Sequence, residues 1–332
     1  MLKKLKDTDF LSISSRVRAM ENRLLTRDRM ERMLDARSGD EAAKVLTECG
    51  YPELSQLTPS ALDAMLAQAR EETYRDLSGA VPDPGLVDVF RIKYDYHNAK
   101  VLIKAQAMGL TPDRLLVEGG RYAPDTLRDA YEKEDLRTCT PEFAQAVVQA
   151  RDLLASSADP QSADILLDQA YYAEMLQAAR ETGSDFLLGY VRLAIDAANL
   201  RSVVRSARME RGVEFLSKVL LEGGNVPTDR ITGSKEGEAF SLFGGALADA
   251  AALGAERAAP GSGRLTAFER ACDNALMDYL AAAKRVPFGE QPVVGYLFAK
   301  ESEFTAIRII LSGRMDQLGA DVIRERLREA YV

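Results

Sequence analysis

Tryptophan is absent from this 332-residue sequence, histidine occurs only at His97, and the three cysteines lie far apart. A single histidine excludes a metal site built from several imidazoles and any catalytic triad that needs two histidines. Cys49, Cys139 and Cys272 form neither a disulfide framework nor a metal-binding cysteine motif, so we expect a reducing cytoplasm. The sequence therefore predicts no metal site.

Long apolar runs are also missing, and we expect no cleavable leader. No stretch reaches the roughly 18 to 20 apolar residues that are needed to cross a bilayer, and no apolar segment near the start is long enough for a signal peptide. The nearest candidate for a span, residues 239–255, is rich in alanine and glycine and is interrupted by Asp249. We expect these residues to form a helix or a helical hairpin in a soluble domain.

The sequence has neither an excess of positive charge nor a phosphate-binding loop. Its formal net charge of −8 argues against a general nucleic-acid binder, which normally presents a basic surface. No GxxxxGK[ST] motif occurs, and the glycine turns at 118–120, 222–224 and 261–264 lack the spacing of a nucleotide cradle. We therefore expect no catalytic residues, no cofactor and no nucleic-acid partner.

Sustained alternation of apolar and polar residues, which is typical of a half-buried strand, is absent as well. Apolar residues instead recur at helical spacing, as in Leu62, Met65, Leu66 and Ala69. Glycine and proline interrupt this pattern at 82–85, 109–112, 156–160, 222–227, 259–263 and 286–292. The sequence predicts an all-α fold.

Similar segments recur about once in every hundred residues. LVEGGRYAPD at 116–125 resembles LLEGGNVPTD at 220–229, and Asp63, Asp168 and Asp273 are separated by 105 residues each. This period is longer than the about 34 to 47 residues of common helical repeats. It predicts three related helical units, at 1–118, 119–222 and 223–332.

Each predicted unit contains one helix with an acid at the edge of its apolar stripe and a base on the opposite flank. The three segments, 93–105, 194–206 and 300–313, align without gaps from the acid onward. Three residues after the acid stands asparagine in two copies and alanine in the third, and two residues later stands a base. The aligned residues are Asp95, Asn98 and Lys100, then Asp196, Asn199 and Arg201 with Arg205 as a second base, and finally Glu303, Ala306 and Arg308.

A carboxylate at the margin of a core needs a partner, because burial without one is unfavourable. We therefore interpret the acids and bases of these helices as contacts that fasten each unit to its neighbours. A second interpretation is that the same flanks face a central cavity or a partner protein.

The recurrent helices and the C-terminal segment YLFAKESEFTAIRIILSGRMDQLGADVIRERLREAYV resemble the C subunit of archaeal- and bacterial-type A/V-ATPases, whose eukaryotic relative is the d subunit of the vacuolar ATPase. The resemblance covers essentially the whole chain. It is strongest in IDAANLRSVVR, similar to the family's D-x-x-N-L-[KR] box, and in YLFAKESEFTAIRIIL, similar to its K-E-x-E-[IF] box. The matching residues are Asp196, Asn199 and Arg201, with Lys300, Glu301, Glu303 and Arg308; Asp95, Asn98 and Lys100 match more loosely.

The resemblance implies a non-catalytic part of a rotary ATPase. In that family three similar helical domains, arranged with pseudo-threefold symmetry, surround a funnel that receives the central shaft subunits D and F. The base of the funnel rests on the membrane proteolipid ring, at the cytoplasmic face of the membrane. The implied function is torque transmission in ATP-driven proton or sodium transport or in ATP synthesis.

Two other functions are compatible with an all-α chain. The first is a helical-repeat adaptor protein unrelated to rotary ATPases, which the long repeat period disfavours. The second is a helical enzyme with a carboxylate-rich cavity, which the single histidine and the absence of paired metal-ligand motifs disfavour. Co-purification with a proteolipid ring, with another soluble partner, or with none would distinguish these functions.

Overall fold

A computed structural model of the chain describes residues 5–112, 115–235 and 237–332. Every regular element within these ranges is helical, which confirms the predicted all-α fold. The chain divides into two compact units. The central unit is Gly85–Ala239, and the terminal unit joins the described residues before Gly85 to Phe240–Val332. The prediction of three repeated units concerns internal similarity, which a division by compactness does not test.

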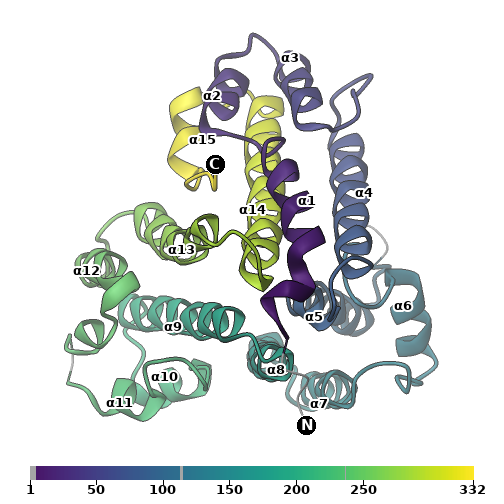
Figure 1. Ribbon diagram of the computed structural model, residues 1–332. Helices are drawn as coiled ribbons and strands as arrows, with labels where there is room; N and C mark the ends of the chain where they lie inside the picture. Colours follow the sequence, from purple (N-terminus) through teal and green to yellow (C-terminus); the bar gives the residue numbers. More distant parts are fainter. Residues whose placement is uncertain (1–4, 113–114, 236) are drawn as a thin grey trace. The chain divides into compact units, whose positions relative to one another are not determined.

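The central unit is built around one long helix, α8, which packs against α5, α7 and α9 (Figure 1). Lys100 and Lys104 of α5 pair with Asp168 and Asp164 of α8 respectively, so α5 and α8 run antiparallel. The helices of this unit are α5 (Gly85–Met108), α6 (Pro124–Glu132), α7 (Pro141–Ser157), α8 (Pro160–Thr182), α9 (Asp185–Arg208), α10 (Val213–Val219) and α11 (Thr228–Gly233).

Capping residues place the two ends of α8. Asp159 accepts a hydrogen bond from the Gln161 backbone N–H at 3.0 Å, and Pro160 occupies the first helical position, where no N–H is needed. At the other end Gly183 adopts a left-handed φ of 70°, and Ser184 then caps α9 by accepting the Leu187 N–H. These signals make α8 and α9 an antiparallel hairpin with a two-residue connection.

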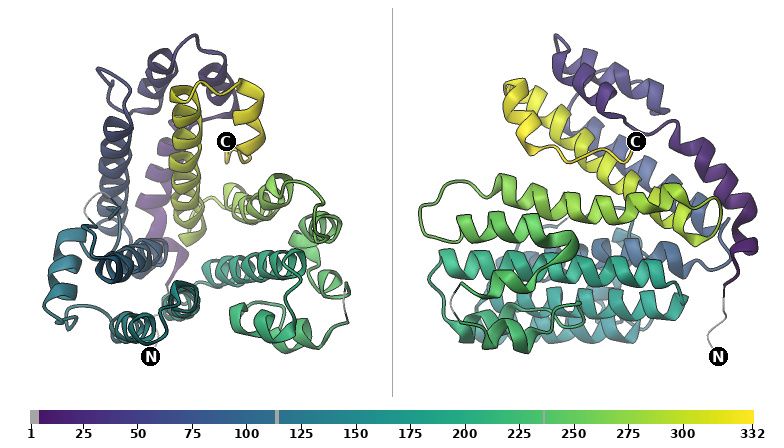
Figure 2. Two further views of the ribbon diagram at one scale, coloured as in Figure 1. Left: turned by 180° about the vertical axis from the view of Figure 1, so that it is seen from behind. Right: turned by 60° about the vertical axis from the view of Figure 1, so that its left-hand side comes forward.

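The terminal unit is organised around α14, which contacts α1, α2, α3, α4, α13 and α15 (Figure 2). Its helices are α1 (Leu11–Glu21), α2 (Arg27–Asp35), α3 (Gly39–Lys44), α4 (Pro59–Ser78), α12 (Ala248–Arg257), α13 (Thr266–Ala281), α14 (Glu290–Met315) and α15 (Ala320–Arg326). Short 3₁₀ helices occur at Asp7–Phe10, Val45–Cys49, Gly245–Leu247 and Ala282–Arg285, and another, Ala239–Leu242, lies at the boundary of the two units.

The apolar stripe that the sequence places on α14 lies in the core of the terminal unit. Phe304 is 3% exposed, and Ile307, Ile310 and Leu311 are fully buried against residues of α2, α3 and α4. Burying each such side chain contributes about 1.5–3 kcal/mol. The stripe therefore fixes which face of α14 is inward and leaves the acid and the base at its margins.

Residues 239–255 form two short 3₁₀ helices followed by most of α12, rather than one continuous helix. Within the described ranges, none of the helices is both long enough and apolar enough to span a membrane. The predicted break at 156–160 corresponds to the α7–α8 turn, and the break at 259–263 corresponds to the α12–α13 connection.

Candidate functional site

The three acids of the recurrent helices are deeply buried. Asp95 on α5 is 0% exposed, and Asp196 on α9 and Glu303 on α14 are each 3% exposed. A buried carboxylate destabilises the fold unless charged or hydrogen-bonding groups surround it. Each of the three meets a loop that leads into a short helix, and we call this contact a carboxylate clasp.

The Asp95 clasp joins α5 to the loop before α6. The Tyr122 backbone N–H donates to Asp95 Oδ1 at 3.3 Å, and Arg121 Nε donates to Oδ2 at 2.6 Å. Gly120 lies against the carboxylate, and a Cβ at this position would come well within 3.0 Å of Asp95 Oδ1. The glycine therefore lets the loop approach the acid.

Arg121 is shared by two carboxylates, because its Nη1 also donates to Glu174 Oε1 at 2.7 Å. Glu174 on α8 accepts further hydrogen bonds from the hydroxyl groups of Tyr96 and Thr140. Burial raises the pKa of Asp95 to about 6, against the lowering effect of Arg121. One buried guanidinium thus compensates two acids, and Asp95 is held closer to protonation than an exposed aspartate.

The Asp196 clasp joins α9 to the loop before α11. The backbone N–H groups of Asn225 and Val226 donate to its two oxygens, each at 3.0 Å, and the Asn225 side-chain amide donates at 2.8 Å. A Cβ at Gly224 would come well within 3.0 Å of Asp196 Oδ1. Burial raises the pKa of Asp196, and these hydrogen bonds oppose the rise.

The asparagines of α5 and α9 bind the same loops five residues before the amide that contacts the acid. Asn98 donates to the Val117 carbonyl and accepts from the Val117 N–H, both at 2.9 Å. Asn199 makes the same pair of bonds to Leu221, both at 2.8 Å. A primary amide can satisfy a backbone N–H and C=O together, which aspartate cannot do.

The Glu303 clasp joins α14 to the loop before α2. The Leu25 backbone N–H donates to Glu303 Oε2 at 2.6 Å, and the Tyr51 hydroxyl donates to Oε1 at 2.5 Å. Lys300 Nζ lies 2.5 Å from the same Oε1 and 3.0 Å from the Tyr51 oxygen. Burial and the nearby Glu303 carboxylate raise the pKa of Tyr51 well above its usual value.

Glu301 occupies a second polar position on α14. Its carboxylate accepts a hydrogen bond from the Tyr74 hydroxyl of α4 and lies 4.0 Å from Arg70 Nε. In the box that the sequence groups together, Lys300 and Glu303 therefore share Tyr51 as a partner, whereas Glu301 contacts α4.

The bases of the recurrent helices lie nearer the surface. Lys100 Nζ is 2.6 Å from Asp168, and Arg308 Nη1 is 2.5 Å from Asp63, so each base meets one of the aspartates spaced by 105 residues. Arg201 is half-buried and Arg205 is exposed on α9, and both engage other groups. Asp273, the third of the spaced aspartates, pairs with Arg328 at 2.6 Å.

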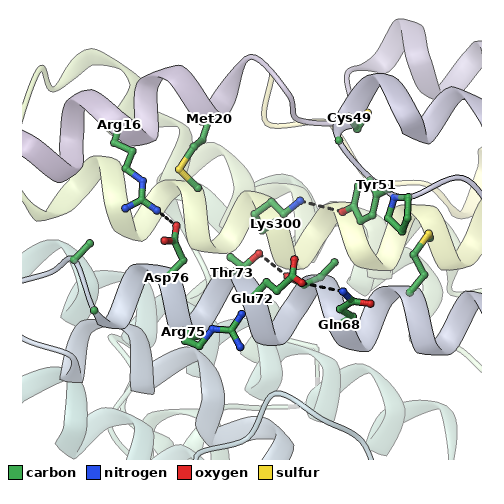
Figure 3. A pocket seen from close by; sticks show the side chains of 16 residues that line it. Arg16, Met20, Cys49, Tyr51, Gln68, Glu72, Thr73, Arg75, Asp76 and Lys300 are labelled. Atoms are coloured by element: carbon green, nitrogen blue, oxygen red, sulfur yellow. Dashed lines mark hydrogen bonds and ion pairs between the residues drawn. The ribbon is translucent and has the colours of Figure 1, made fainter.

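A groove of about 740 Å³ lies in the terminal unit, lined by α1, α4, the 49–52 loop and Lys300 (Figure 3). Figure 3 shows Lys300 directed towards the Tyr51 hydroxyl. Lys300 also contacts Glu303, so the groove shares Lys300 and Tyr51 with the Glu303 clasp. Arg16 of α1 and Asp76 of α4 form an ion pair across it. The charged lining residues are Arg16, Glu72, Arg75, Asp76 and Lys300.

No group of three or more His, Cys, Asp or Glu side chains in the described ranges is arranged to hold a metal ion. The Nε2 atom of His97 lies 3.1 Å from the Leu115 carbonyl oxygen. This is a local contact between α5 and the following loop.

Sequence reasoning missed the partners of the acids. Leu25 and Tyr51 lie 278 and 252 positions from Glu303, which accepts their hydrogen bonds, and no local pattern identifies such contacts. The EGG turns at 118–120 and 222–224 carried a usable signal, since a glycine beside a buried acid indicates close approach of the backbone.

Comparison with known proteins places this architecture in a family. The ATP synthase (C/AC39) subunit family matches residues 13–326. The C subunit of a V-type sodium ATPase from Enterococcus hirae is 24% identical over 325 residues, covering 97% of this chain and 99% of the relative. The C subunit of a V-type ATP synthase from Thermus thermophilus is 24% identical over 333 residues, covering 94% and 95%. The C subunit of an A-type ATP synthase from Methanocaldococcus jannaschii is 23% identical over 340 residues, covering 95% and 85%.

The chain belongs to the ATP synthase C/AC39 subunit family. Its relatives are named as the C subunits of V-type and A-type rotary ATPases, and they are similar to it over nearly their full length. The resemblance drawn from the acid–asparagine–base helices is confirmed.

Proposed function

We propose that this chain couples the rotating shaft of a V/A-type ATPase to its membrane ring. It would receive shaft subunits D and F at one end and rest on the proteolipid ring at the other, at the cytoplasmic face of the membrane. Three related helical units, at about 1–118, 119–222 and 223–332, would surround a funnel for the shaft. The chain would serve ATP-driven proton or sodium transport or ATP synthesis without performing catalysis itself.

The full-length similarity to proteins named as C subunits of these ATPases is the observation that carries this proposal. The internal contacts of the chain support it. A torque coupling must deform little under load, and closely packed helices have low compressibility. The buried clasps tie separate segments together through hydrogen bonds to ionised carboxylates, which are stronger than hydrogen bonds between neutral groups.

A binding assay with purified components tests the proposal. The chain, the D–F shaft and the detergent-solubilised proteolipid ring of the same organism would be mixed in pairs and all together, then separated by size-exclusion chromatography. We expect a ternary complex that needs this chain as the bridge. Failure of the chain to bind either component would contradict the proposal.

A second assay tests the non-catalytic part. We expect isothermal titration of the purified chain with MgATP to give no stoichiometric binding, and a coupled assay to give no phosphate release. The reconstituted ATPase serves as the positive control. Stoichiometric nucleotide binding by the isolated chain would contradict a purely mechanical role.

A further inference from the structure

The three clasps use one backbone position. Tyr122 directly precedes Ala123, the N-cap of α6, and Val226 directly precedes Pro227, the N-cap of α11. Leu25 directly precedes Thr26, the N-cap of α2. In each case the N–H of the residue before the N-cap donates to the carboxylate of a long helix.

When the sequence is aligned on the residue before each N-cap, a third copy of the segment that contains EGG becomes visible. Residues 20–30, 117–127 and 221–231 read MENRLLTRDRM, VEGGRYAPDTL and LEGGNVPTDRI without gaps. All three copies have glutamate at the second place, aspartate at the ninth and a buried apolar residue at the eleventh. The buried residues are Met30, Leu127 and Ile231. The first copy lacks both glycines, so the EGG pattern alone does not find it.

The missing glycines have a physical explanation. Gly119 and Gly223 adopt left-handed φ values of 104° and 96°, whereas Asn22, their counterpart, has an ordinary φ of −64° because α1 continues to Glu21. Gly120 and Gly224 leave room for an aspartate, but the first copy has Arg23 at this place. The acid of this clasp, Glu303, is a glutamate, whose side chain is longer than that of aspartate by one methylene.

Helix α1 also explains why α14 has Ala306 at the position where α5 and α9 have asparagine. Val117 and Leu221 lie outside helices, and their N–H and C=O groups are satisfied by Asn98 and Asn199. Their counterpart, Met20, lies in the last turn of α1, where its carbonyl already accepts from Arg23 N–H at 3.0 Å. An asparagine at Ala306 would therefore find no free backbone pair.

We propose that Asp95, Asp196 and Glu303 are positioning residues, which fix where each following short helix begins and thereby set the geometry of the junctions between repeats. The length of the acid is matched to the residue at the fourth place of the aligned loop: aspartate occurs with Gly120 or Gly224, and glutamate occurs with Arg23. We call this the matching rule. This inference rests on the proposed function only for its mechanical consequence, which is that loosened junctions transmit less torque.

The Asp196 clasp offers a direct test of the matching rule. Asp196→Glu and Gly224→Ala would each misfit, whereas the double variant would reproduce the pairing of Glu303 with a side-chain-bearing residue. Amide exchange of the 223–230 segment would be followed by mass spectrometry. We expect each single variant to exchange at least about tenfold faster than the wild type, and the double variant to return to within about threefold.

Gly212→Ala is the matched control, because a Cβ there has open space and Gly212 has a negative φ of −71°. We expect its 223–230 segment to exchange as in the wild type. Unchanged exchange in Gly224→Ala, or additive effects in the double variant, would overturn the matching rule.

The mechanical consequence needs the assembled complex. ATPases reconstituted in vesicles with the wild type, Gly224→Ala or Gly212→Ala would be compared for ions transported per ATP hydrolysed. We expect Gly224→Ala to transport at least about twofold fewer ions per ATP, and Gly212→Ala to match the wild type. An unchanged ratio in Gly224→Ala, despite its faster exchange, would overturn this consequence. If the wild-type chain itself fails to join the shaft to the ring, the proposed function fails, whereas the exchange experiment still decides the matching rule.

Discussion

In the central unit, backbone amides and an asparagine side chain surround Asp196, whereas in the terminal unit Glu303 shares its oxygens among a backbone amide, a tyrosine and a lysine. The loop at Asp196 contains two glycines and wraps closely around the acid. The loop at Glu303 follows directly from α1 and cannot wrap in this way. A longer acid reaches across, and side chains from elsewhere supply the missing donors. One junction thus depends on backbone shape, and the other depends on charge.

The largest expected effect is at Glu303. Glu303→Ala leaves the Leu25 N–H, the Tyr51 hydroxyl and Lys300 without their acceptor, so we expect the free energy of unfolding to fall by roughly 3–5 kcal/mol. Urea denaturation measures the change. Thr305→Ala, on the exposed side of α14, is the control and should change stability by less than about 0.5 kcal/mol.

A double variant sharpens this prediction. Replacing Lys300 and Glu303 together by methionine removes both charges, so the loss of stability should be smaller than in Glu303→Met alone. Equal losses would show that the lysine does not depend on this carboxylate for its charge compensation.

The next largest effect on stability is expected at the asparagine side chains that bind the loop backbone. Asn199→Ala removes two buried hydrogen bonds to Leu221 and should lower the free energy of unfolding by roughly 2 kcal/mol. Ala306→Asn, the reciprocal change in the terminal unit, should give no gain, because the backbone of Met20 is engaged in α1 and Ala306 is only 6% exposed. Thermal unfolding of both variants checks this contrast, and stabilisation by Ala306→Asn would contradict it.

A pH effect of about 1 kcal/mol is expected from Asp95. Its pKa is raised from 3.8 to about 6, so between about pH 4 and pH 6 the folded protein binds more protons than the unfolded chain. The contribution of Asp95 to the free energy of unfolding therefore rises by about 1 kcal/mol as the pH falls from 7 to 5. Urea denaturation at pH 7 and pH 5 measures this rise in the free energy of unfolding, and we expect the Asp95→Asn variant to lack it. Glu132→Gln, an exposed site on α6, should keep it.

The smallest effect is expected at the outer ion pairs. Arg308 and Asp63 are about half exposed, with side-chain values of 49% and 58%. Arg308→Ala should therefore lower the free energy of unfolding by at most about 1 kcal/mol, and high salt should reduce the difference. A loss as large as that of Glu303→Ala would mean that the surface pairs, and not the buried clasps, hold the junctions.

Much of the local structure was readable in the sequence. Helical spacing predicted α4 around Leu62 and Met65, and the turn at 156–160 was identified because Pro160 restricts the backbone locally. The buried faces of α5, α9 and α14 followed from the same periodicity. The acid at the margin of each face indicated a contact, because a half-buried charge needs a partner.

The partners themselves were not predictable from spacing. Leu25 offers Glu303 only a backbone N–H, and every residue except proline carries one. Tyr51 gave no sign that its hydroxyl would meet an acid 252 positions away. The third copy of the loop, at 20–30, was not predicted because it lacks the two glycines. Helix α1 continues to Glu21, so Asn22 keeps an ordinary φ and no glycine is needed there.

The sequence by itself determined that the chain is helical, where its helices break, and which residue types recur on its long helices, since these features depend on neighbours within a few turns. Only the tertiary structure decided that the two ends of the chain form one compact unit around α14, and which backbone amide each buried acid holds. Such contacts depend on distances in space between segments far apart in the chain, and local patterning places no constraint on them.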